Sequence, residues 1–251
     1  MTISEKISGK DFRRAFKRRW YVLWAITVAL ILYPINNSFT RITILASFAG
    51  LWVGMLYFYW DRRVIRSAVL AITAAAGFFM VLPGRNPDVS ELRQKYVASL
   101  GKYEGTRYIW GGENRLGIDC SGLVRSGLMV ADYEHGLGTL NAGLVREGIS
   151  MWWHDCSARA LGEEYRHVTR FLFSSPSVNQ IDGSRILPGD IAVTADGIHT
   201  LAYLGDQIWI EADPDAKRVV KVHVPSGSPW FQQEVPLMRW TQLDEKPSVS
   251  P

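Results

Sequence analysis

The sequence has very little cysteine: Cys120 and Cys156 are the only two in 251 residues. Two cysteines are too few for a disulfide scaffold, although one bridge between them is an alternative in an oxidising compartment. His154 lies two residues before Cys156, but no second pair of ligands completes a zinc site. A Walker loop and internal repeats are also missing. These absences exclude disulfide-rich domains, zinc fingers, P-loop nucleotide hydrolases and repeat arrays.

Positive charge is scarce in the C-terminal two thirds of the chain. The net charge is +4, yet residues 83–251 carry 17 Lys or Arg against 21 Asp or Glu. Residues 1–82 carry 11 against 3, so the basic excess belongs to the N-terminal third. Long uncharged runs lie in the same third, and this combination is typical of membrane topology rather than of nucleic-acid contact. The sequence therefore predicts a lipid bilayer as a partner and no nucleic acid.

Uncharged runs with aromatic residues near their ends predict transmembrane helices in the N-terminal third, because each run is close to the length that crosses a bilayer. We expect three spans in a membrane anchor of residues 1–84, over about residues 20–40, 42–60 and 64–82.

Basic segments at residues 11–19 and 61–66 flank these runs. The positive-inside rule places both segments in the cytoplasm, so an odd number of spans leaves everything after Pro83 on the outer side. A cleavable signal peptide is the alternative to the first span. If the short third run does not cross, the remaining domain faces the cytoplasm instead.

The rest of the chain predicts an α+β domain over residues 85–245 and a flexible tail over 246–251. Asp88 or Ser90 can cap a helix that ends near Gly101, and Asp119 can cap the next helix. Residues 140–161 are expected to be helical in pieces. Alternating apolar residues and tight turns then predict an antiparallel meander of five strands, at residues 191–194, 199–204, 207–212, 219–224 and 235–240.

Cys120 is the candidate nucleophile, because it stands at the predicted start of a helix. Free N–H groups and the positive end of the helix dipole favour a thiolate at such a position. A cysteine nucleophile needs a base and a third group that orients the base. His199, which opens a strand after an Asp-Gly turn, is the favoured base. Glu211 on the next strand is the favoured orienting group, and Asp213 competes for that role.

Four motifs resemble, in order, those of the NlpC family of papain-like cysteine peptidases. They are Tyr108-Ile-Trp-Gly-Gly, Asp119-Cys-Ser-Gly-Leu-Val124, Leu187-Pro-Gly-Asp-Ile191 and His199-Thr-Leu-Ala-Tyr-Leu-Gly205. The resemblance covers about residues 90–225, with a longer segment than usual between the second and third motifs. It implies a papain-like fold in which helices pack on an antiparallel sheet.

The family's roles carry over to matching positions. The resemblance makes Cys120 the nucleophile and His199 the general base, and it places Tyr108, Asp119 and Ser121 at the substrate or oxyanion site. The third residue in the family is usually His, Asn or Gln, whereas the matching position here holds Glu211. We expect its carboxylate to accept a hydrogen bond from the Nδ1–H of the imidazole.

The resemblance further implies hydrolysis of peptide bridges in bacterial cell walls, at the bond between D-glutamate and the diamino acid, through a thioester and without a metal or an organic cofactor. The predicted protein is then a multi-pass protein of the bacterial cytoplasmic membrane with its catalytic domain outside. Two alternatives remain open: an acyltransferase or amidase acting on lipid or protein, and an inactive binding module.

Overall fold

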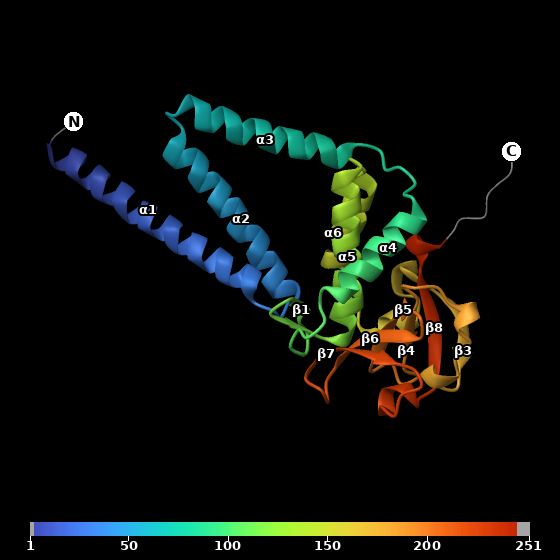
Figure 1. Ribbon diagram of the computed structural model, residues 1–251. Helices are drawn as coiled ribbons and strands as arrows, with labels where there is room; N and C mark the ends of the chain where they lie inside the picture. The colour runs from blue at the N-terminus through green and yellow to red at the C-terminus, as the bar shows by residue number, and fades with distance from the viewer. Residues whose placement is uncertain (1–2, 245–251) are drawn as a thin grey trace, which may run out of the picture. The chain divides into compact units, whose positions relative to one another are not determined.

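The computed structural model describes residues 3–244, and the chain divides into two compact units, Met1–Phe79 and Met80–Pro251. Figure 1 colours the first unit blue to teal and the second from green to red. The predicted tail, residues 246–251, lies outside the described residues.

The first unit contains the helices α1 (Ile3–Leu32) and α2 (Ser38–Tyr59) and most of α3 (Arg63–Val81). α1 and α2 form an antiparallel hairpin. The Trp20 indole N–H donates to the carbonyl of Leu51 at 3.2 Å, and the Phe16 ring packs against the rings of Tyr57 and Phe58. The basic segment around residues 13–19 therefore lies beside the C-terminal end of α2.

The predicted continuous first span over residues 20–40 is wrong, because α1 ends at Leu32. Pro34 disfavours helical backbone at the residue before it, and the Asn37 side chain caps a new helix by accepting from the Thr40 N–H. The uncharged part of α1 from Trp20 onward is about 20 Å long, which is short of the roughly 30 Å hydrocarbon core. Of the described helices, α2 and α3 are the two that are long and apolar enough to span a membrane.

The second unit begins with helices that match the predicted caps. Asp88 accepts a hydrogen bond from the Glu91 N–H at 3.0 Å and caps α4 (Val89–Gly101), whose Leu92, Tyr96 and Leu100 are fully buried. α5 (Cys120–Gly138) follows a small hairpin of β1 (Glu113–Asn114) and β2 (Gly117–Ile118). The segment expected to be helical in pieces forms α6 (Ala142–Trp153) and α7 (Ala158–Gly162).

A six-stranded antiparallel sheet forms the other half of this unit, in the order β3-β8-β4-β5-β6-β7. The bounds are Thr169–Ser175 (β3), Ile191–Val193 (β4), Thr200–Gly205 (β5), Ile208–Asp213 (β6), Arg218–His223 (β7) and Val235–Trp240 (β8). The five predicted strands are confirmed, but their arrangement as a simple meander is wrong for β8, which returns to pair with β4. β3 was not predicted and pairs with the other side of β8.

Short 3-10 helices connect these elements at Tyr165–His167, Val178–Gln180, Gly183–Arg185, Pro229–Phe231 and Thr241–Leu243. The core lies between the helices and the sheet, where α4 and α5 bury apolar side chains against the central strands. Hydrophobic burial on this scale is the main stabilising term for a domain of this size. This packing places α5 against β5 and β6. His199 directly precedes β5, and Glu211 lies on β6.

Candidate active site

Cys120 is the first residue of α5, and Asp119 is its N-cap. The Asp119 carboxylate accepts from the N–H of Gly122 at 2.6 Å, from the N–H of Gly111 at 2.7 Å and from the Ser121 hydroxyl at 3.1 Å. The three donors satisfy both carboxylate oxygens. Asp119 therefore acts as a cap and as an anchor for the glycine loop, and Ser121 supports that cap.

Two glycines in the motifs are required by the backbone geometry rather than by chemistry. Gly111 has φ +74°, a conformation that residues with a Cβ rarely adopt. At Gly122 an added Cβ lies 2.1 Å from the carbonyl oxygen of Gly112, which is backbone and cannot rotate away. The loop and the start of α5 therefore touch directly, and this contact holds Tyr108 and Cys120 in one place.

His199 and Glu211 form a buried pair across the β5–β6 hairpin. Nε2 of His199 lies 2.6 Å from Oε2 of Glu211, and both side chains are almost completely shielded from solvent. The bond uses Nε2, so the expectation of an Nδ1–H bond to Glu211 is wrong. The other glutamate oxygen, Oε1, is buried without a hydrogen-bond partner among the described residues.

Cys120 completes the cluster. Sγ of Cys120 lies 3.8 Å from the carbonyl oxygen of Ile198, the residue before His199, and Cys120 is close enough to the imidazole to raise the pKa of His199. Because Nε2 is engaged by Glu211, Nδ1 is the ring nitrogen left for the thiol. The structure thus brings together the nucleophile, base and orienting group that were predicted from the sequence.

The electrostatics of the cluster favour an imidazolium. Burial alone lowers the pKa of His199, but hydrogen bonds with Cys120 and Glu211 and their negative charges raise it to about 9. Burial raises the pKa of the Glu211 carboxyl, against the opposing effect of the hydrogen bond from His199. We assign the shared proton to His199, because imidazole is the stronger base of the two in water.

Trp230 is a site residue that the sequence analysis missed. Its ring stacks on the imidazole of His199 with centroids 4.4 Å apart and an interplanar angle of 29°. A tryptophan face stabilises a cation and shields the histidine from water. Its indole N–H is buried and has no partner in the described part of the chain. No periodic pattern marks Trp230, which sits in a 3-10 turn 31 residues after His199.

Tyr108 lies near the nucleophile and is partly buried. Burial, together with the negative charges of Cys120 and Asp119, raises the pKa of the Tyr108 hydroxyl to about 12, so it remains a neutral donor. Asp213, the competitor of Glu211, instead accepts a hydrogen bond from the N–H of Asp215 at 2.7 Å.

Cys156 differs from Cys120 in its surroundings. Both cysteines are free thiols, so the alternative of a bridge between them is not realised in the structure. Burial raises the pKa of the Cys156 thiol to about 11, despite the opposing charge of Arg125. A thiol of this kind is a poor nucleophile near neutral pH.

A model of the NlpC/P60 family matches residues 105–239, which include Tyr108, Cys120, His199, Glu211 and Trp230. The chain belongs to the NlpC/P60 family. This family of cysteine peptidases is the one that the sequence motifs resemble, and the domain is an enzyme domain of that type. No curated protein sequence matches the chain.

Solved structures of the NlpC/P60 family are similar to this chain. NlpC1 from Trichomonas vaginalis is 19% identical, with a TM-score of 0.37, and the match covers 59% of this chain and 43% of that one. The peptidoglycan hydrolase RipB from Mycobacterium tuberculosis is 18% identical, with a TM-score of 0.39, and coverage of 66% and 76%. This chain thus spans less than half of the length of NlpC1.

Proposed function

We propose that the protein is a membrane-tethered cysteine hydrolase that cleaves amide bonds in peptidoglycan stem peptides, at the bond between D-glutamate and the diamino acid. The observation that carries the proposal is the buried cluster in which His199 bonds Glu211 while Cys120 lies close enough to raise the pKa of the imidazole. Membership of the NlpC/P60 family supports cell-wall amides as the substrate class.

The proposed reaction begins with a thiolate–imidazolium pair. The Cys120 thiolate attacks the carbonyl carbon of the amide, and the electron pair of the C=O bond moves to oxygen. The imidazolium then gives its proton to the leaving amine from Nδ1, the ring nitrogen that Glu211 does not engage. A water molecule deprotonated by His199 attacks the thioester, releases the acid and restores the thiolate.

The proposed oxyanion site is at the start of α5. As the first residue of the helix, Cys120 has a backbone N–H with no intrahelical partner, which is free to donate to the developing oxyanion. The neutral Tyr108 hydroxyl lies close enough to Cys120 to feel its charge, and we assign it as a second donor. The positive end of the helix dipole stabilises the same charge.

The proposed orientation in the membrane depends on α2, α3 and the loop between them. Arg62, Arg63 and Arg66 in or beside this loop favour the cytoplasmic side. The basic segment of α1 lies beside the same end of α2, because Phe16 packs on Tyr57 and Phe58. With the loop inside, α3 leads outward and the catalytic unit follows it into the compartment of the cell wall.

The test is digestion of purified peptidoglycan by the full chain in detergent, with the new termini identified by mass spectrometry. We expect free amino groups on the diamino acid, and no product from the Cys120→Ala variant. A Cys156→Ala variant is the matched control and should keep its activity. Intact stem peptides together with acyl transfer to an added lipid or amine would instead establish the acyltransferase alternative.

A further inference from the structure

A cleft of about 660 Å³ opens in the second unit, and none of Cys120, His199 and Glu211 lines it. This volume is within the range of small-molecule sites. Part of the lining is apolar and comes from Leu128, Leu144 and Met151. The long segment between the second and third motifs supplies much of the wall through α6.

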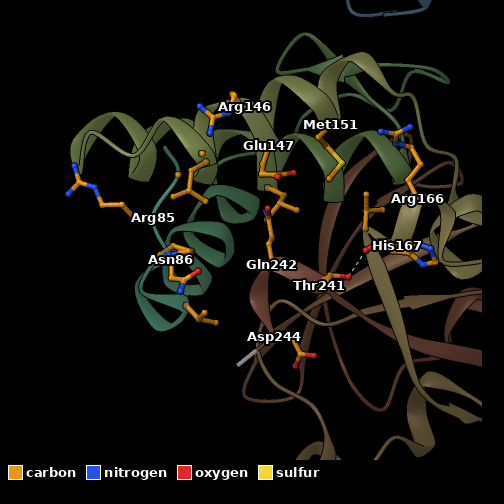
Figure 2. A pocket seen from close by; sticks show the side chains of 17 residues that line it. Arg85, Asn86, Arg146, Glu147, Met151, Arg166, His167, Thr241, Gln242 and Asp244 are labelled. Carbon is orange, nitrogen blue, oxygen red and sulfur yellow. Dashed lines mark hydrogen bonds between the residues drawn. The ribbon is translucent and has the colours of Figure 1, made fainter. Parts of the chain in front are cut away.

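Three arginines give the cleft its charge: Arg85, Arg146 and Arg166. Figure 2 shows Arg85 and Arg166 on opposite sides, with Met151 and Gln242 between them. The guanidinium groups of Arg85 and Arg166 have no hydrogen bond or ion pair within residues 3–244. Arg146 donates to the carbonyls of Met80 and Leu82 at 2.9 and 2.8 Å.

The lining also contains two acidic residues, Glu147 and Asp244. Asp244 is already neutralised, because it is paired with Arg170 and lies 3.8 Å from a guanidinium nitrogen of Arg239. Within the lining, Glu147 is thus the one carboxylate that no such pair neutralises. The lining has three arginines, so its charge is positive overall. The balance favours a ligand that carries negative charge.

The cleft lies close in sequence to the end of α3, and this position indicates what kind of anion it binds. Gly84 and Arg85 line it, and Gly84 is only three residues beyond Val81, the last residue of α3. Three residues reach at most about 10 Å, so the cleft lies near the bilayer surface if α3 crosses the membrane. The Asn141 side chain holds the segment that follows α3 in place, since it accepts from the Arg85 N–H at 3.1 Å and donates to the Arg85 carbonyl at 2.8 Å.

We infer that this cleft binds the head group of an anionic phospholipid. The phosphate contacts the free guanidinium group of Arg85, which follows α3, and Arg166 adds positive charge on the opposite side of the cleft. The glycerol and first methylenes lie on the apolar lining between them. Arginine is well suited to phosphate, and basic residues at a membrane surface attract anionic lipids. The inference rests on the proposed membrane anchoring, but not on the proposed hydrolysis.

The experiment uses the full chain in detergent micelles and measures dissociation constants by native mass spectrometry. The probes are dihexanoyl phosphatidylglycerol, dihexanoyl phosphatidylcholine and glycerol 3-phosphate. We expect saturable binding of the first lipid, with at least about 30-fold weaker binding in an Arg85→Glu, Arg166→Glu double variant. An Arg159→Glu, Arg185→Glu double variant has the same charge change at exposed positions outside this cleft, and it should bind like the wild type.

An Arg85→Lys, Arg166→Lys double variant keeps both charges and should retain most of the binding. This result would show that the glutamate variant loses binding through its charge and not through misfolding. Equal binding of the two lipids, equal loss in the control pair or undiminished binding in the glutamate pair would each overturn the inference. Equally tight binding of glycerol 3-phosphate would show that the cleft takes a free phosphate ester rather than a lipid. Peptidoglycan digestion in the same sample separates failure of this site from failure of the hydrolase.

Discussion

Replacing Glu211 with glutamine tests whether its charge holds the proton on His199. The amide oxygen still accepts from Nε2, but the negative charge 2.6 Å from the imidazole is lost. A buried hydrogen bond to a charged partner is worth about 1 to 1.5 kcal/mol more than a neutral one, which corresponds to about one pKa unit. The pKa of His199 should therefore fall from about 9 toward 8.

The predicted consequence is a shift in the alkaline limb of kcat/KM, because His199 must be protonated to give its proton to the leaving amine. At pH 9 the protonated fraction falls by about fivefold in the Glu211→Gln variant, whereas at pH 7 it hardly changes. The assay is release of amino groups from peptidoglycan between pH 6 and 10. Glu163→Gln, at an exposed glutamate far from the triad in sequence, is the control.

The same pKa shift makes folding depend on pH. A pKa of His199 raised above its unfolded value near 6.5 stabilises the folded state fully below pH 6.5, and this contribution is lost as the pH rises through 9. In the Glu211→Gln variant this stabilisation should be lost at a lower pH than in the wild type. The measurement is the Tm of the full chain in detergent at each pH. An unchanged alkaline limb together with an unchanged pH dependence of Tm would refute the role assigned to Glu211.

Further predictions concern the nucleophile and its helix. A thiol-reactive probe at pH 7 should label Cys120 in preference to Cys156, because burial raises the pKa of the Cys156 thiol to about 11; equal labelling in peptide maps would contradict this. Gly122→Ala should destabilise the domain and lower its activity, since its Cβ meets the Gly112 carbonyl at 2.1 Å; an unchanged Tm would argue against that contact. Asp119→Ala should cost about 1 to 2 kcal/mol of stability through loss of the cap, measurable by denaturant unfolding, with Asp119→Asn retaining most of it.

Features that depend on local chemistry were predictable from the sequence. Asp88 and Asp119 are caps because a short acceptor before an apolar-periodic segment satisfies free N–H groups, whatever lies elsewhere in the chain. The His199 and Glu211 strands are joined by a two-residue turn, so their pairing follows from hairpin geometry. Which imidazole nitrogen of His199 bonds Glu211 was not predictable, because the orientation of the ring depends on where α5 places Cys120.

Features set by distant partners were not predictable. β3 has an irregular burial pattern and becomes a strand only because β8 offers it an edge. Trp230 reaches His199 from a turn that no local pattern connects to the site. The first predicted span is wrong because Pro34 and the Asn37 cap divide that uncharged run into two helices.

The position of β8 has a consequence for the order of folding. This strand is the last along the chain within residues 3–244, yet it lies between β3 and β4 and joins them. The β5–β6 hairpin that carries Glu211 needs only neighbouring residues, whereas joining β3 to β4 requires a contact that spans the rest of the domain. Such long-range pairing slows folding. A newly made chain therefore completes its sheet only after residues 235–240 have emerged.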